Sequence, residues 1–189
     1  MTSTDPVAGP DVVDVLTADH REFQDLAQQI SVAADPGVRR DLTDQLIAEL
    51  VRHAVAEEMF VYPAMRDHLP NGEEAVEHDT EEHKELERLM KQLEGADTSD
   101  LAFEEALGNL RQVLDDHVRD EESEQFPALR AHLPAATLAD LREKVELAKK
   151  VAPTRPHPAA PNTELFHKLV GPGVGLVDRL RDRLTDRST

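Results

Sequence analysis

Apolar residues recur at helical spacing along most of the chain, and this pattern predicts four long amphipathic helices. The first is expected to begin after Asp11, a suitable N-cap, and the second after Asp35, with Pro36 in its first turn. The third follows the turn at 69–72, and the fourth ends near His132. The inward-facing positions expected on the second helix are Leu42, Leu46, Leu50, Phe60 and Ala64.

A proline and a shorter helix complete this pattern. Pro63 is expected to bend the second helix or to end it early. A fifth, shorter helix is predicted over 137–150. Long amphipathic segments joined by short turns favour antiparallel neighbours, so the predicted fold is all-α: an up-down four-helix bundle with the fifth helix across it.

The chain divides into three predicted regions. Residues 1–9 are expected to be a disordered tail, and 10–151 to form the bundle domain. Residues 152–189 are read as a Pro-rich linker followed by a small amphipathic helix over 175–187. This last helix could dock on the bundle or on a second copy of the chain, which would give a homodimer.

Composition narrows the classes of partner. The chain has 21 Lys plus Arg against 39 Asp plus Glu, a formal net charge of −18, which argues against nucleic acid and anionic membrane surfaces. The absence of cysteine removes disulfides, thiolate nucleophiles and zinc–thiolate sites. No apolar run reaches the ~18 residues of a membrane span, and the N-terminus lacks the features of a signal peptide. We therefore expect a cytoplasmic protein.

An internal repeat identifies the residues of greatest interest. The 18 residues from His53 align with the 18 from His117, and nine of these positions are identical. The 12 residues from Asp19 align with those from Glu82, with four identities. The bundle is therefore predicted to consist of two copies of a helical hairpin related by a pseudo-twofold axis.

The repeat pairs six metal-ligand side chains that also lie on the apolar stripes. The pairs are His20 with His83, His53 with His117, and Glu57 with Glu121. Burying a carboxylate without a partner destabilises a fold by roughly several kcal/mol. The stripes contain no Lys or Arg that could pair with these carboxylates. A cation held by these imidazoles and carboxylates would compensate, and the symmetry suggests two first-row metal ions bridged by Glu57 and Glu121. Few ligands per metal would leave positions for water, an oxo bridge, dioxygen or peroxide.

Several other polar residues are interpreted as structural. His78 is the alternative ligand on the third helix, but it has no counterpart in the repeat and is expected to be exposed. His68 and His132 are expected to satisfy the ends of their helices. His157 and His167 lie in the C-terminal region, away from the predicted centre. The remaining candidates are expected to be solvated carboxylates or, for the tyrosine, a packing aromatic; they are Glu58, Glu122, Glu81, Glu82, Asp115, Asp116 and Tyr62. The alternative for Glu58 and Glu122 is a hydrogen bond to a metal-binding histidine, and the alternative for Tyr62 is a metal-reactive tyrosine.

At these residues the sequence resembles the hemerythrin-like, or HHE cation-binding, family. The six paired residues match the order of ligands in that family, H…HxxxE…H…HxxxE. The resemblance covers about residues 10–150. It implies a non-haem di-iron centre with an oxo or hydroxo bridge, in which the four histidines are terminal ligands and Glu57 and Glu121 bridge.

One departure from the family separates this chain from the oxygen-carrying hemerythrins. Those proteins have a second histidine four residues from the first on the third helix, and HxxxxD on the fourth. Here the corresponding neighbours of His83 are Asp79 and Glu87, and the fourth helix carries HxxxE. One iron would then have an open site or a carboxylate, which favours reactivity, sensing or iron handling over reversible oxygen carriage.

Three functions are consistent with these observations. The first is a di-iron protein that binds or reacts with a small oxidant (O2, peroxide or nitric oxide) in stress defence or sensing. If it is an enzyme, catalase-like peroxide disproportionation is the simplest chemistry. The alternative is a non-catalytic protein for iron storage or delivery, or a metal-dependent interaction module. The third is a metal-free scaffold with histidines in a polar core.

Overall fold

The computed structural model describes residues 9–152, and no strand occurs among them. The α-helices are α1 (Val12–Val32), α2 (Pro36–Ala56), α3 (Tyr62–His68), α4 (Gly72–Gly95), α5 (Leu101–Asp120), α6 (Phe126–His132) and α7 (Ala135–Val151). Two π-helical turns, η1 (Glu57–Val61) and η2 (Glu121–Gln125), join α2 to α3 and α5 to α6. The predicted all-α class is confirmed. The proposed N-terminal tail and C-terminal extension lie almost entirely outside the described residues.

The helix starts follow from local capping. The Asp11 side chain accepts a hydrogen bond from the Asp14 N–H (3.1 Å), and the Asp14 carboxylate accepts one from the Asp11 N–H (2.8 Å). At α2, the Asp35 carboxylate accepts from the Val38 N–H (2.9 Å), and Pro36 occupies the first turn. Both predicted starts are confirmed. The fifth helix, α7, begins at Ala135, two residues before its predicted start.

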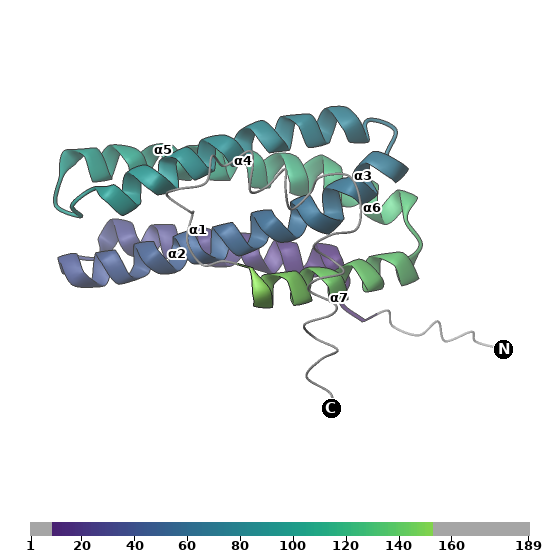
Figure 1. The fold of residues 1–189 in the computed structure, drawn as a ribbon, viewed down its shortest axis with the longest axis horizontal. Helices are drawn as coiled ribbons and strands as arrows, with labels where there is room; N and C mark the ends of the chain where they lie inside the picture. Colours follow the sequence, from purple (N-terminus) through teal and green to yellow (C-terminus); the bar gives the residue numbers. More distant parts are fainter. Residues whose placement is uncertain (1–8, 153–189) are drawn as a thin grey trace. The chain divides into compact units, whose positions relative to one another are not determined.

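The helices form two hairpins that pack into a bundle. Figure 1 shows α1 beside α2 and α4 beside α5, with the first pair lying below the second. The short helices α3 and α6 extend the second member of each hairpin at the same end of the bundle. The fifth helix of the bundle, α7, packs mainly on α1, α2 and η1 of the first hairpin and makes a smaller contact with α6.

Each π-turn precedes a proline. A proline lacks an N–H, and its ring collides with the carbonyl four residues earlier, so α-helical hydrogen bonding is interrupted there. Before Pro63 the turn is wider, and the N–H of Tyr62 donates to the carbonyl of Glu57. The same bond joins Phe126 to Glu121 ahead of the second proline. Of the two predicted effects of Pro63, the early end of the helix is wrong, because the helical run continues to His68.

The π-turn also corrects the predicted inward face beyond Glu57. An extra residue in one turn rotates every later side chain by about 100° around the helix. Phe60 and Ala64, predicted to face inward, are only partly buried, whereas Val61 and Met65 are fully buried. The face of the first part of α2 is unaffected: Leu46 and Leu50 are buried as predicted, whereas Leu42 is only partly buried. Among residues 9–152, no helix combines the length and the hydropathy that a membrane crossing requires.

Candidate metal centre

The structure brings the six predicted side chains together inside the bundle. Each lies on a different segment, and all are buried, with side chains at most 5 % exposed. They are His20 on α1, His53 on α2, Glu57 on η1, His83 on α4, His117 on α5 and Glu121 on η2. Both carboxylates occupy the first position of a π-turn, so the wide turns begin at the centre itself.

The Nε2 atoms of the histidines point toward the two glutamates. The distance from His53 Nε2 to Glu57 Oε2 is 3.1 Å, and that from His83 Nε2 to the same oxygen is 3.5 Å. His20 Nε2 lies 3.1 Å and His117 Nε2 3.6 Å from Glu121 Oε2. Each glutamate therefore faces one histidine of its own helix and one from another helix, as the pseudo-twofold repeat requires.

Most of these inward-facing atoms lack a hydrogen-bond partner among the described residues. They are the Nε2 atoms of His20, His53 and His117 and all four carboxylate oxygens of Glu57 and Glu121. Atoms so deeply buried are rarely left unsatisfied in native proteins. Two ligand atoms on one ion are about 3–3.4 Å apart when each bond is about 2.1 Å long, and the distances observed here are similar. The donors therefore fit a metal ion.

The donors fall into two overlapping groups whose ligand atoms lie within 4.8 Å of one another. One contains His20, His53, Glu57 and Glu121, and the other contains Glu57, His83 and His117. Because Glu57 belongs to both, the two groups are adjacent and share a carboxylate. This arrangement can hold two cations side by side.

Each histidine also contacts a second carboxylate through its other ring nitrogen. The Nδ1 distances are 2.9 Å for His20–Glu122, 3.1 Å for His53–Asp19, 3.1 Å for His83–Glu58 and 3.0 Å for His117–Glu82. Carboxylates in this position fix the ring orientation and leave Nε2 free to bind a metal. The four pairs obey the repeat, since Glu58 corresponds to Glu122 and Asp19 to Glu82.

The expectation that Glu82 is solvated is therefore wrong. For Glu58 and Glu122 the structure shows the alternative, a hydrogen bond to a histidine, rather than the solvated charge that was expected first. These carboxylates flank the centre, with side chains 14–23 % exposed, and each is held by a histidine. The signal was present in the repeat: Asp19 and Glu82 immediately precede a paired histidine, and Glu58 and Glu122 immediately follow a paired glutamate. Their positions on the helices place them at the edge of the apolar stripe, where a carboxylate can point either to solvent or to a neighbouring histidine.

Two of these outer carboxylates form ion pairs with basic side chains. Arg21 lies 2.5 Å from Glu122, and Lys149 of α7 forms an ion pair with Asp19. The fifth helix therefore contacts the centre indirectly, through Asp19 and then His53.

The charges at the centre shift the pKa values of its groups. Burial alone would lower the pKa of His53, but Glu57 and Asp19 outweigh burial and raise this pKa to about 10. The pKa values of His83 and His117 are also raised, against burial, by the carboxylates that they contact. Burial would raise the pKa of Glu57, yet the neighbouring His53 and His83 hold it well below the usual range. In the absence of a cation, protonated imidazoles balance the buried carboxylates.

One half of the centre is more polar than the other. Tyr62 stacks on His83, with ring centroids 5.5 Å apart, and its hydroxyl lies 3.1 Å from His83 Nε2. The corresponding contact in the other half is apolar, since Phe126 stacks on His20 at 5.6 Å. Tyr62 is thus a packing aromatic, as predicted, but its hydroxyl also reaches a candidate metal ligand.

A buried carboxylate adds to this asymmetry. Asp79, one turn before His83, is fully buried, and its Oδ1 accepts a hydrogen bond from Gln125 (2.8 Å). In the repeat, Asp79 corresponds to Leu16 and Gln125 corresponds to Val61, so the first hairpin is apolar at both positions. Burial and the nearby Glu121 raise the pKa of Asp79 to about 7. The carboxylate that the sequence predicted near His83 is therefore Asp79, whereas Glu87 pairs with Lys91 (3.3 Å).

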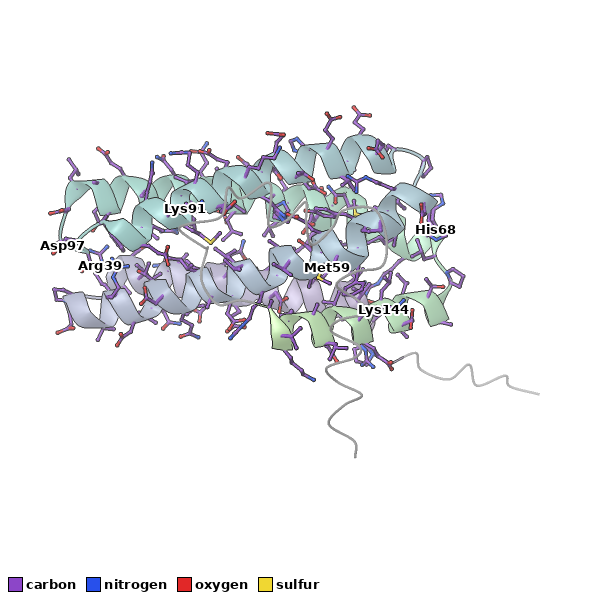
Figure 2. All side chains as sticks on the ribbon, viewed as in Figure 1. Arg39, Met59, His68, Lys91, Asp97 and Lys144 are labelled. Carbon is purple, nitrogen blue, oxygen red and sulfur yellow. The ribbon has the colours of Figure 1, made fainter. Side chains whose placement is uncertain are left out.

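The other histidines lie away from the buried centre. His78 is exposed, as predicted. His68, labelled in Figure 2, and His132 are exposed in the last turns of α3 and α6, as their interpretation as helix-end residues requires. His157 and His167 are outside the described residues.

Fold and donors together define a class, the helical bundles that bind cations through buried histidines and carboxylates. A family model described as the Hemerythrin HHE cation binding domain matches residues 11–129. The chain belongs to this family, and it is a hemerythrin-like cation-binding domain whose His/Glu clusters are able to hold metal.

Individual relatives agree with this assignment. An uncharacterized hemerythrin-like protein of Schizosaccharomyces pombe is 32 % identical over 174 residues, covering 92 % of this chain and 86 % of the relative. A crystal structure of a hemerythrin HHE cation binding domain-containing protein from Mycobacterium kansasii has the same fold, with a TM-score of 0.66 and 22 % identity, and covers 91 % of this chain and 99 % of its own. A DNA nickase of Nostoc is 29 % identical over 138 residues, 73 % of this chain, which spans only 39 % of the nickase.

Proposed function

We propose that the chain holds a pair of iron ions and binds or reacts with a small oxidant (O2, peroxide or nitric oxide) in stress defence or sensing. The observation that carries this proposal is the pair of overlapping donor groups sharing Glu57, in which most inward atoms have no hydrogen-bond partner among the described residues. Mixed nitrogen and oxygen donors from facing helices suit first-row metals. When bound, iron would supply the exchange of electrons with the oxidant.

The number of protein ligands would leave coordination positions for a small molecule. The group around His83 offers three ligand residues, and the other group offers four. Iron commonly takes more ligands than this, so a small molecule could complete the set. The smaller group is therefore the proposed place for the oxidant.

The chain's own residues would orient a small polar molecule on that side. The Tyr62 hydroxyl, 3.1 Å from His83 Nε2, can donate a hydrogen bond toward this position. Asp79 Oδ2 has no hydrogen-bond partner among the described residues and can accept one, or donate one when protonated. On the opposite side, the stacked ring of Phe126 offers no hydrogen bond and excludes water from His20.

The nickase relative does not extend this proposal to DNA. The chain spans 39 % of that protein, and its own net charge of −18 opposes contact with a polyanion.

Metal content is the first test. The purified chain, expressed with iron supplied, is expected to contain about two irons, by elemental analysis, since two donor groups are present. His83→Ala should lose iron from the smaller group and lose peroxide consumption with it. His132→Ala, which changes an exposed histidine at a helix end, is the matched control and should retain both.

A second variant separates reactivity from metal binding. Tyr62→Phe gives the smaller group the aromatic residue that the repeat already carries at Phe126. We expect it to keep its iron and to change the rate of peroxide consumption or the visible spectrum of the nitric oxide adduct. A chain without metal, or His83→Ala with unaltered peroxide consumption, would overturn the proposal. Full iron content without any response to the three oxidants would favour storage or delivery instead.

A further inference from the structure

A second cluster of potential metal ligands lies on the surface beside the buried centre. His78 Nε2 is 3.5 Å from Glu82 Oε1 and 3.5 Å from Asp120 Oδ2, and the ligand atoms of all three residues lie within 4.8 Å of one another. The His78 side chain is 56 % exposed and that of Asp120 is 37 % exposed. The cluster is thus open to solvent on one side.

The spacing of these atoms suits a shared cation better than direct contact. A distance of 3.5 Å is longer than a charge-assisted hydrogen bond between an imidazole and a carboxylate. Two ligand atoms about 2.1 Å from one ion, at a tetrahedral angle, are about 3.4 Å apart. Asp120 uses its other oxygen, Oδ1, for Arg119 (3.4 Å), so Oδ2 remains directed at His78.

The repeat shows that this cluster is particular to the second hairpin. The matching residues of the first hairpin are Val15, Asp19 and Ala56. There α7 covers the site: its apolar face packs with Ala56 and Val15, and its Lys149 pairs with Asp19. The second hairpin has no such cover among residues 9–152, and it carries His78 and Asp120 where the first has apolar side chains.

The surface cluster is connected to the buried centre. Glu82 links the two, because its Oε1 faces His78 while its Oε2 lies 3.0 Å from His117 Nδ1. Asp79 lies just inside: it is fully buried, its Oδ2 has no hydrogen-bond partner among the described residues, and one of its oxygens is within 4.8 Å of ligand atoms of Glu82 and His117. A series of neighbouring carboxylate and imidazole side chains therefore extends from the surface to His117.

We propose that His78, Glu82 and Asp120 form a surface site that captures a divalent cation and passes it, by way of Glu82 and Asp79, to the buried centre. This inference rests on the proposed function, since it requires that the centre hold metal. A cation entering here exchanges its water molecules for protein oxygens one step at a time. The acidic surroundings, within a chain of net charge −18, raise the local cation concentration.

Ferrous ion is the probe for a loading experiment. The chain is stripped with a chelator, mixed with Fe2+ without oxygen, and sampled for the iron that a colorimetric chelator still captures. The test variant combines His78→Ala with Asp120→Asn, which leaves Glu82 and its bond to His117 intact. His132→Ala is the matched control, because it removes an exposed histidine elsewhere. Circular dichroism of each stripped chain checks the fold.

The double variant is expected to load about tenfold more slowly than the parent chain while reaching the same final iron content. The parent chain, once loaded, should also bind one further, weakly held Mn2+ that the double variant does not bind. Equal loading rates at equal final iron content would overturn the loading route alone. A buried centre that takes up no iron in any chain would overturn the proposed function and the route together.

Discussion

Loading the centre with metal should release protons, because imidazoles that are charged in the stripped chain must become neutral to bind a cation. The carboxylates around His53, His83 and His117 raise the pKa of all three rings, that of His53 to about 10. At pH 7 the His53 ring carries a proton, and the raised pKa values of His83 and His117 favour their charged forms. Glu57 is already ionised, since its pKa is held well below the usual range. Metal binding therefore displaces protons mainly from nitrogen.

The magnitude follows from counting these rings. Filling both donor groups at pH 7 should release about one proton from His53 and further protons from His83 and His117, up to about three per chain. Each proton exchanged changes the free energy of binding by about 1.4 kcal/mol per pH unit, so three give about 4 kcal/mol. The sign is that affinity rises with pH, and it continues to rise until the pH passes the pKa of the rings.

Calorimetry measures this number directly. Titration of the stripped chain with Fe2+ or Zn2+ in two buffers of different ionisation enthalpy yields the protons released per metal bound. His83→Ala should release about one proton fewer, since one charged ring is removed. His132→Ala should leave the count unchanged. Release of less than about one proton in total would refute the reasoning, because the rings would then be neutral before the metal arrives.

Three further outcomes are expected. Leu110→Ala removes a fully buried side chain, so the free energy of unfolding measured in urea should fall by about 2–5 kcal/mol. Lys149→Met leaves Asp19 without its ammonium partner and should cost about 1–3 kcal/mol by the same measurement, whereas Lys150→Met, one residue further on, should cost little. The stripped chain should lose stability as the pH rises from 6.5 toward 10, because a folded-state pKa raised to about 10 makes protonated His53 stabilising only below that range. A flat pH profile from urea titrations would contradict this assignment.

The centre could be predicted because two independent patterns agree on the same residues. Helical periodicity places His20, His53 and Glu57 on apolar faces, and the repeat then selects their partners in the second hairpin. A polar side chain at one inward position is weak evidence, but the same side chain at two matched positions is much stronger. The structure brings all six residues together because symmetry-related hairpins place matched positions around one axis.

The face beyond Glu57 could not be predicted from periodicity. A spacing of 3.6 residues per turn is assumed throughout such an analysis, and Pro63 can end, bend or widen a helix. Only packing selects among these outcomes. Here the wide turn buries Val61 and Met65 and leaves Phe60 at the edge of the core.

The role of the outer carboxylates could not be decided from the sequence for a different reason. Glu58, Glu82 and Glu122 lie at the border between the buried and exposed faces of their helices. Whether such a side chain meets water or a histidine depends on the rotamer and on the neighbouring helix. Sequence periodicity specifies neither the rotamer nor the neighbouring helix. The repeat of Glu58 as Glu122 nevertheless indicated a shared role.

The outer carboxylates have a consequence for the order of events in maturation. Each imidazole of the centre is held at Nδ1 by Asp19, Glu58, Glu82 or Glu122, and protons can balance the buried charge until a cation arrives. We therefore expect the bundle to fold without metal as a template for its helices. Metal insertion would then follow folding, so that supply of the ion, rather than synthesis of the chain, would set when the protein becomes functional.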